Sequence, residues 1–366
     1  MNKTRLSRVA AAALAAVSLV VLSACSSGAA PVASPSGGMV SVLPDGVSLS
    51  GPSGSPAPQP LAQQQTIKVG VFSKLETVAP VLLADAEGEF QKENLKVEFV
   101  YDTPPNLFTL LGQGKIDVVQ GGTTGLVFNA LRQGVPVRWL SGLSQSPQDS
   151  GLYLSTKIAA SSKDFQPAQI KGAKIAVNPG GLSSPAAYPI YSVLQKAGLN
   201  PGDVTLQVFN DKASMVQALN AGSVDGAIIG PPFTSALTPG VAFWAEPAYP
   251  DDIQIAGYYG TSILTGTKSD VGEAFFRAIL RTVNTYLTGD YHKNADTVAT
   301  LAKVLDSTPQ IITSTPAITF DFNVPEKSVG ALQDMYATVP NTLQYDNRVT
   351  PDELVDLSLV LQASGH

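Results

Sequence analysis

The residue types that most often carry out covalent catalysis or bind metals are scarce in this sequence. Its 366 residues include one cysteine, Cys25, and two histidines, His292 and His366. Neither a Ser-His-Asp triad nor a metal site with several histidines is easily assembled from two histidines. The acylation pattern Ser-x-x-Lys and the nucleophile pattern Gly-x-Ser-x-Gly do not occur either. The sequence therefore predicts a protein that is not an enzyme and that holds no metal or cofactor.

Hydroxyl groups and glycines gather instead just after predicted strands. Ser73 follows the first of these strands and forms the pattern Ser-x-x-Glu with Glu76, which is typical of a capping box. The run Gly121-Gly-Thr-Thr124 follows a second strand. After a third, Ser184 fits the N-cap of a helix and Pro185 its first position. Since ligands of parallel sheets bind beyond the carboxyl ends of the strands, these loops are candidate binding elements.

We expect a ligand to contact residues of these loops and of neighbouring segments: Ser73, Gly122, Thr123, Thr124, Ser144, Gly181, Ser183, Ser184, Phe233 and Tyr259. Each hydroxyl has a plain helix cap as its alternative role, and core packing is the alternative for the two aromatic residues. Lys74 is the only basic residue beside the loops that follow these strands. Neutral donors and helix N-termini suit a sulfonate-like or other small anion, or a small neutral heterocycle.

The elements that position these residues alternate between strand and helix. Short β-branched runs predict strands over 66–72, 96–101, 116–120, 137–141, 174–178, 204–209 and 226–229. Helical spacing is expected over 107–112, 125–133, 185–197, 213–220, 271–287 and 296–305, so that the last third is mainly helical. This alternation predicts an α/β fold of mostly parallel sheets with helices on both faces.

One segment occurs twice. Leu110-Leu-Gly-Gln-Gly-Lys-Ile-Asp117 resembles Ala218-Leu-Asn-Ala-Gly-Ser-Val-Asp225, with both glycines and both aspartates 108 residues apart. Each copy reads as a helix that ends at glycine, which tolerates the left-handed conformation, followed by a strand. Two copies of one unit predict two similar lobes, although such junctions also occur in unrelated α/β proteins.

The N-terminus has the pattern of an export signal. Three basic residues precede an apolar run over 10–22, which is too short for a bilayer that requires about 20 residues. The run ends in Leu22-Ser-Ala-Cys25, which resembles the lipobox of bacterial lipoproteins. That resemblance implies lipidation of Cys25 and a mature protein held on the extracytoplasmic face of the cell membrane. An ordinary signal with a chance cysteine is the alternative.

The next segment is poor in charge and rich in Ser, Gly and Pro. Residues 26–65 contain Asp45 as their only charge, so we expect a flexible, disordered linker. Without the three basic residues of the signal, the formal net charge falls from −6 to −9. An acidic protein repels polyanions, which makes nucleic acid an unexpected partner.

From residue 66 to about 310 the order of motifs resembles ABC-transporter substrate-binding proteins of the alkanesulfonate, taurine, nitrate and thiamine-pyrimidine group. The repeated segment resembles the L-x-x-G-x-[IV]-D element found in each lobe of that family. Further matching stretches are Leu83–Glu98, Ala130–Val137, Ile170–Val177, Lys196–Val204 and Gly230–Phe233. The resemblance implies a two-lobed, type II periplasmic-binding-protein fold with a ligand cleft between the lobes.

The same resemblance implies a domain order and a function. The signal would cover 1–24, the anchor and linker 25–65, lobe one 66–154 and 258–366, and lobe two 155–257, with crossings near Ser155 and Tyr258. We expect a monomeric solute-binding protein that delivers a small organic ligand to an ABC permease. The alternatives are an enzyme on this fold that resembles thiamine-pyrimidine synthase, and a ligand-sensing lipoprotein without a transporter.

Overall fold

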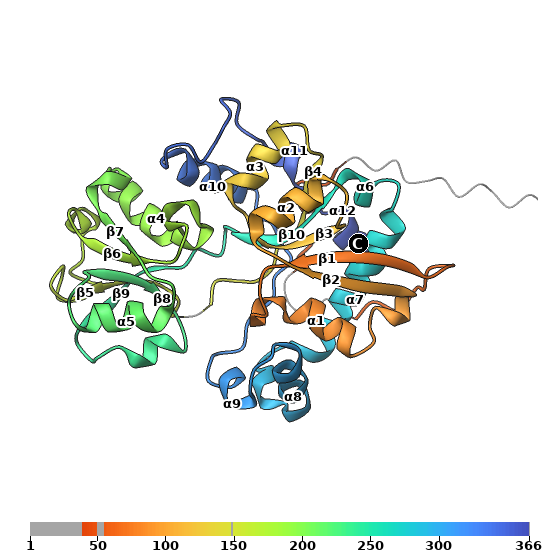
Figure 1. Ribbon diagram of the computed structural model, residues 1–366, viewed down its shortest axis with the longest axis horizontal. Helices are drawn as coiled ribbons and strands as arrows, with labels where there is room; N and C mark the ends of the chain where they lie inside the picture. Colours follow the sequence, from red (N-terminus) through yellow and green to blue (C-terminus); the bar gives the residue numbers. More distant parts are fainter. Residues whose placement is uncertain (1–38, 50–54, 148, 366) are drawn as a thin grey trace, which may run out of the picture. The chain divides into compact units, whose positions relative to one another are not determined.

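Two five-stranded sheets organise the residues that the computed structural model describes, 39–49, 55–147 and 149–365 (Figure 1). The first sheet has the order β2 (Leu95–Tyr101), β1 (Gln65–Val71), β3 (Val118–Gly122), β10 (Ala256–Thr261) and β4 (Val137–Ser141). The second has the order β7 (Thr205–Val208), β6 (Lys174–Val177), β8 (Gly226–Ile229), β5 (Gly151–Ser155) and β9 (Ala242–Pro247). The expected signal and Cys25 lie outside the described residues.

The two sheets share one topology. In the first, β1 pairs in parallel with β2 and β3, and β10 pairs antiparallel with β3 and β4. In the second, β6 pairs in parallel with β7 and β8, and β5 pairs antiparallel with β8 and β9. Each sheet therefore has one reversed strand, which lies between its third and fourth parallel strands. The predicted fold class, two lobes with mostly parallel sheets, is confirmed.

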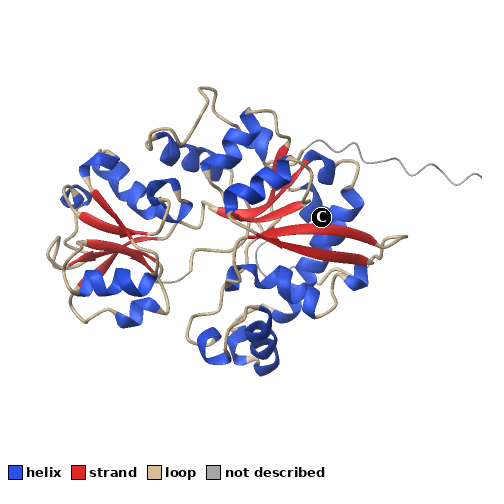
Figure 2. Cartoon of the chain, in the orientation of Figure 1, coloured by secondary structure: helices blue, strands red, loops and turns tan. Residues whose placement is uncertain are grey.

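Helices cover both faces of each sheet (Figure 2). In the second lobe, α4 (Tyr188–Ala197) and α5 (Lys212–Asn220) lie on opposite faces (Figure 1). The first lobe carries α1 (Ala79–Ala86), α2 (Pro104–Gly112), α3 (Gly125–Arg132), α6 (Ser262–Thr265), α7 (Ser269–Tyr286), α8 (Ala295–Val304), α9 (Pro309–Ile312), α10 (Lys327–Ala337), α11 (Pro351–Leu354) and α12 (Ser358–Ser364). Each lobe has its own buried apolar cluster around its sheet. Among the described helices, none combines the length and apolar character that crossing a membrane requires.

The strands and helices predicted from the sequence are present, with ends that differ by a few residues. The reversed strands β5 and β10 and the edge strand β9 were not predicted. They contain few β-branched residues, and residues such as Gly151, Gly257 and Pro247 weaken the strand pattern. Their pairing with distant strands, rather than their own composition, makes them extended.

The repeated segment has the same structural role in both lobes. Gly114 and Gly222 have φ angles of +66° and +67°, as expected for residues that end a helix. Asp117 Oδ2 accepts a hydrogen bond from the backbone N–H of Lys68 at 2.9 Å, and Asp225 Oδ2 accepts from that of Lys174 at 2.9 Å. Asp117 thus ties the start of β3 to the neighbouring strand β1, and Asp225 ties the start of β8 to the neighbouring strand β6.

The chain passes between the sheets earlier than the sequence predicts. β5 ends at Ser155, near which the first crossing was expected, but β5 belongs to the second sheet. The first connection therefore runs through 142–150. The return runs through 248–255, since β10 already belongs to the first sheet.

The linker expected over 25–65 is ordered in its described parts, 39–49 and 55–64, which we call the N-terminal strap. Leu49 is 2% exposed, and its N–H donates to Asn323 Oδ1 at 3.0 Å. The carbonyl of Val40 accepts from the N–H of Leu357 at 2.8 Å, and that of Gln59 accepts from Arg277 Nη2 at 3.1 Å. Apolar side chains separated by Ser, Gly and Pro gave no periodic pattern, so only the tertiary contacts show that the strap is bound to the first lobe.

A buried charge network lies beneath the strap. Arg281 Nε donates to Glu89 Oε2 at 2.9 Å, and Arg277 Nε donates to Glu93 Oε2 at 3.0 Å. A further hydrogen bond joins Arg281 to Glu93. All four residues are at most 5% exposed. Buried charges are tolerated where they are paired and hydrogen-bonded, and the strap supplies additional carbonyl acceptors to both arginines.

Candidate functional site

Unpartnered polar atoms mark the first-lobe half of the candidate site. Ser73 Oγ, Thr124 Oγ1 and Gln120 Oε1 are buried and have no hydrogen-bond partner within the described part of the chain. They lie after or at the carboxyl ends of β1 and β3. Buried polar groups are almost always hydrogen-bonded in proteins, so these exceptions need an explanation. A bound ligand or ordered water would supply the missing partners.

The alternative helix-cap roles do not account for these hydroxyls. Thr124 is the N-cap residue of α3, but its side chain makes no capping hydrogen bond. The capping box expected between Ser73 and Glu76 is not formed, because Glu76 binds the C-terminal part of the chain instead. Both hydroxyls are therefore available for another function.

Thr123 and Tyr259 bind each other. The Thr123 hydroxyl and the Tyr259 hydroxyl are hydrogen-bonded, and both residues are 0% exposed. The carbonyl of Thr123 accepts from the Tyr336 hydroxyl at 2.6 Å. Tyr259 also packs edge-to-face on Phe108, with ring centroids 5.3 Å apart. In this structure the pair holds β10 to the loop after β3 and offers no free hydroxyl to a ligand.

Glu76 joins the loop after β1 to two C-terminal segments. Its Oε1 accepts a hydrogen bond from the Tyr291 hydroxyl at 2.5 Å and lies 2.7 Å from His292 Nε2. His292 Nδ1 lies 2.9 Å from the carbonyl oxygen of Thr315. Burial lowers the pKa of His292, but the hydrogen bond and charge of Glu76 outweigh it, so the pKa is raised from its usual 6.5. Burial and the same carboxylate raise the pKa of Tyr291.

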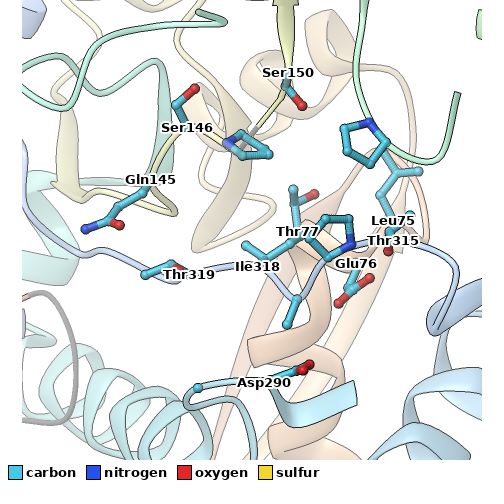
Figure 3. A pocket seen from close by; sticks show the side chains of 15 residues that line it. Leu75, Glu76, Thr77, Gln145, Ser146, Ser150, Asp290, Thr315, Ile318 and Thr319 are labelled. Carbon is cyan, nitrogen blue, oxygen red and sulfur yellow. The ribbon is translucent and has the colours of Figure 1, made fainter. Parts of the chain in front are cut away.

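A pocket of about 520 Å³ lies beside this cluster. Figure 3 shows its labelled lining side chains, which come from separate stretches of the chain. The lining residues are Leu75–Thr77, Gln145–Pro147, Ser150, Pro231, Gly289, Asp290 and Thr315–Thr319. Among these described residues none is Lys, Arg or His, whereas Glu76 and Asp290 are acidic. The first crossing, 142–150, thus supplies part of the wall.

The second-lobe half of the site is a tight turn followed by a helix. Gly180 and Gly181 have φ angles of +100° and +51°, which favour glycine. Ser184 Oγ accepts from the N–H of Ala186 at 3.3 Å, which confirms its N-cap role. Ser183 Oγ lies 3.3 Å from the hydroxyl oxygen of Thr342, a residue far along the chain. The predicted Gly181 and Ser184 line one small pocket.

The same small pocket contains Lys212, which the sequence interpretation passed over. It is the first residue of α5, whose N-cap Asp211 accepts a hydrogen bond from the N–H of Ser214. Its ammonium group donates a hydrogen bond to the carbonyl of Ile228, at the carboxyl end of β8. Burial lowers the pKa of Lys212 to about 8. The sequence signal was its position at the start of the helix that follows β7.

The remaining predicted residues are structural in this arrangement. Ser144 is 6% exposed and forms a bridge with Phe320, and its carbonyl accepts from the Tyr249 hydroxyl at 2.8 Å. Phe233 begins a short 3-10 helix, Phe233–Ala236, and packs on the second core. A Cβ at Gly122 would lie 2.8 Å from Pro185 Cγ, so this position requires the small residue.

Comparison with solved structures defines the class of fold. The periplasmic aliphatic sulphonate binding protein SsuA from Escherichia coli is 18% identical, with 76% of this chain and 95% of that chain covered and a TM-score of 0.55. The periplasmic nitrate-binding protein NrtA from Synechocystis PCC 6803 is 15% identical, with 84% and 90% covered and a TM-score of 0.57. The desulfurization enzyme DSZB is 14% identical, with 82% and 99% covered and a TM-score of 0.52. The fold is that of two-lobed periplasmic binding proteins.

The family follows from the sequence itself. The family model described as NMT1/THI5 like matches residues 76–287, more than half of the chain. The chain therefore belongs to the NMT1/THI5-like family, and its resemblance to substrate-binding proteins of this group is confirmed. A comparison with curated proteins finds no match.

Proposed function

We propose that this protein is an extracytoplasmic solute-binding protein, anchored to the cell membrane through Cys25, that delivers a small organic solute to an ABC importer. The pocket of about 520 Å³ carries the proposal. It is lined by the loop after β1, by the first crossing and by Pro231 of the second lobe. A hinge motion at the crossing would change its walls, as capture and release of a solute require. We expect the protein to act as a monomer.

The charges of this pocket favour a neutral or N–H-bearing group over a sulfonate. Its charged lining residues are the carboxylates of Glu76 and Asp290. A sulfonate placed there would meet two acidic side chains and no cation among the described lining residues. Between the two ligand classes predicted from the sequence, we infer that a small heterocycle is held in this pocket.

An enzyme remains the second candidate, because DSZB shares the fold. An enzyme resembling thiamine-pyrimidine synthase would need a free histidine in the site. His292 binds Glu76, which lines the pocket, but it lies in a short 3-10 helix, Tyr291–Lys293, and does not follow a strand of either lobe. Both its ring nitrogens are hydrogen-bonded, and its side chain is 7% exposed. This arrangement supports a positioning role for His292 and favours binding over catalysis. A sensing lipoprotein would bind the same solute but act without a permease.

The first experiment is native mass spectrometry of protein purified from its own membrane, to identify a co-purified solute. Ser73→Ala and Thr124→Val are then compared with wild type in affinity for that solute. We expect each to weaken binding roughly two- to tenfold, as for loss of one neutral hydrogen bond. Neither change should lower the melting temperature of the ligand-free protein, because both hydroxyls lack partners there.

The matched control is Ser161→Ala, because the Ser161 hydroxyl binds Asp164 in an exposed turn of the second lobe. It should leave affinity unchanged. If Ser73→Ala and Thr124→Val bind the solute like wild type, the buried hydroxyls after β1 and β3 do not take part in binding, and this half of the proposed site fails. Conversion of the solute to a product would support the enzyme instead.

A further inference from the structure

The two ring nitrogens of His292 both face hydrogen-bond acceptors. Nε2 lies 2.7 Å from Glu76 Oε1, and Nδ1 lies 2.9 Å from the carbonyl oxygen of Thr315. An ionised carboxylate and a carbonyl have no proton to donate, whereas a neutral imidazole has a single N–H. A neutral His292 would therefore leave one ring nitrogen with its lone pair against an oxygen. The protonated imidazolium donates to both acceptors, so the geometry fits a proton held in this cluster.

The Tyr291 hydroxyl indicates that Glu76 is ionised. Its oxygen accepts a hydrogen bond from the N–H of Ile318 at 3.0 Å, and its own proton is donated to Glu76 Oε1 at 2.5 Å. Burial and the neighbouring carboxylate raise the pKa of Tyr291, so this donor keeps its proton. Glu76 Oε1 therefore receives two hydrogen bonds, as an ionised carboxylate can. If the proton moved from the ring to the carboxylate, the carboxyl group would donate to Nε2 and the cluster would still hold that proton.

The remaining charged groups around the ring are exposed. On its own turn, Asp290 pairs with Lys293 at 2.9 Å. The helix α8 packs on this turn, and its charged residues, Asp296 and Lys303, are exposed. Burial lowers the pKa of His292, but the carboxylate and the carbonyl that its ring faces raise it above 6.5, with a smaller contribution from Asp290. The two buried acceptors therefore govern the charge of this histidine.

Both acceptors belong to walls of the pocket of about 520 Å³. Glu76 comes from the loop after β1, and Thr315 is the first residue of the lining segment 315–319 (Figure 3). Residues 316–319 belong to no helix or strand, so side-chain contacts matter for their position. His292 itself does not line the pocket. It connects two walls that are far apart in the sequence.

We propose that protonated His292 clamps the loop after β1 to the segment 315–319, and that loss of this proton releases one of the two pocket walls. His292 is thus a positioning residue, which holds the pocket in shape without touching a solute. Because its pKa is raised, the clamp is formed at pH 6.5 and below, and it is lost as the pH rises through the pKa of the folded state. The inference goes beyond the proposed function, since it concerns the walls whether or not a solute is bound.

The experiment follows the purified protein across neutral pH without any solute. NMR records the histidine ring signals, and His366→Gln identifies the signal of the other histidine in the sequence. Amide hydrogen exchange measures the protection of the Ile318 N–H, corrected for the pH dependence of intrinsic exchange. We expect His292 to titrate above pH 6.5. Over the same titration the protection of Ile318 should fall about ten- to hundredfold, as for loss of a hydrogen bond between charged groups. The N–H of Val298 in α8 should show no such step.

Two variants separate a proton-dependent clamp from a plain structural contact. Glutamine in His292→Gln donates from a single nitrogen, so the protection of Ile318 should be low and should show no step with pH. Glu76→Gln removes the charge that raises the pKa of His292, so that pKa should fall. His366→Gln is the matched control and should behave like wild type. A wild-type His292 that titrates at or below pH 6.5, or protection of Ile318 without a step at that pKa, would overturn the inference. Both measurements are independent of solute binding, so a failure of the proposed function is seen separately.

Discussion

At the scale of single residues, equivalent aspartates form the same hydrogen bonds to a neighbouring strand in both lobes. Asp117 accepts a hydrogen bond from β1 and Asp225 accepts one from β6, and each donates its own N–H back to the same strand. These reciprocal hydrogen bonds fix the register of β1 with β3 and of β6 with β8, which pair over only three and two residues. The repeated aspartate is thus a structural residue, although it belongs to the motif that identifies the family.

Replacing Asp225 tests this role. Asp225→Ala leaves the backbone N–H of Lys174 without its charged acceptor, so we expect the free energy of unfolding to fall by about 1.5–3 kcal/mol. Urea denaturation measures the loss. Asp164→Ala is the control, since that carboxylate binds only an exposed serine. Equal midpoints for the two variants would show that the aspartate does not hold the strands.

A second residue-scale prediction concerns pH. Arg132 holds the pKa of Glu353 down to about 2, with a further contribution from the N–H of Thr350, against a usual value of 4.5. A depressed carboxylate pKa stabilises the folded state above pH 4.5, and this contribution is lost as the pH falls toward 2. Because the Glu353 side chain is 42% exposed, the effect should stay below about 1 kcal/mol.

Wild type and Glu353→Gln should therefore differ in unfolding free energy at pH 7 and converge between pH 4.5 and pH 2. Thermal unfolding across this range is the measurement. A difference that persists at pH 2 would mean that Glu353 acts through packing and not through its charge.

At the scale of elements, the N-terminal strap is part of the first lobe. Its residues contribute a buried leucine, Leu49, and carbonyl acceptors to Arg277 and Arg281. Those arginines are already paired with buried glutamates, so the strap completes the hydrogen bonding of a buried network. Removing it would expose apolar surface and leave donors of both arginines unsatisfied.

Two truncations test the strap. A chain that begins at Met39 should unfold like the full mature protein. One that begins at Gln65 should lose several kcal/mol of stability, of which burial of Leu49 alone accounts for about 1.5–3 kcal/mol. Urea denaturation of both proteins gives the comparison. Equal stability would show that the strap contacts contribute nothing to folding.

At the scale of the whole molecule, the strap limits how far the binding body stands from its proposed anchor. Val40 is hydrogen-bonded to Leu357 of the first lobe, so only residues 26–39 separate Cys25 from the body. That stretch spans at most about 50 Å when fully extended.

The anchor itself is tested by Cys25→Ala. We expect the variant to leave the detergent phase in a phase-partitioning assay, since no other lipid attachment is proposed, or to remain as uncleaved precursor. Wild type should partition into detergent after signal cleavage. A cleaved variant that still enters the detergent phase would disprove lipidation at this cysteine.

The sequence alone determined the secondary structure that depends on the local pattern of apolar residues and glycines. Seven of the ten described strands, half of the twelve described α-helices and the two-lobe repeat follow from short-range periodicity and from glycines such as Gly114 and Gly222 that end helices. The positions of Ser73 and Thr124 after their strands follow from the same logic, because parallel strands direct their carboxyl ends to one edge of a sheet. Family resemblance added the order of these units.

Only the tertiary structure decided which of these side chains are already engaged. Thr123 and Tyr259 satisfy each other, and Glu76 binds Tyr291 and His292 from more than two hundred residues away, so neither pairing has a local signal. Lys212 donates a hydrogen bond to the carbonyl of Ile228, and this contact depends on the strand that packs beside it. Long-range contacts of this kind depend on chain topology, and the spacing of residues along one segment does not encode them.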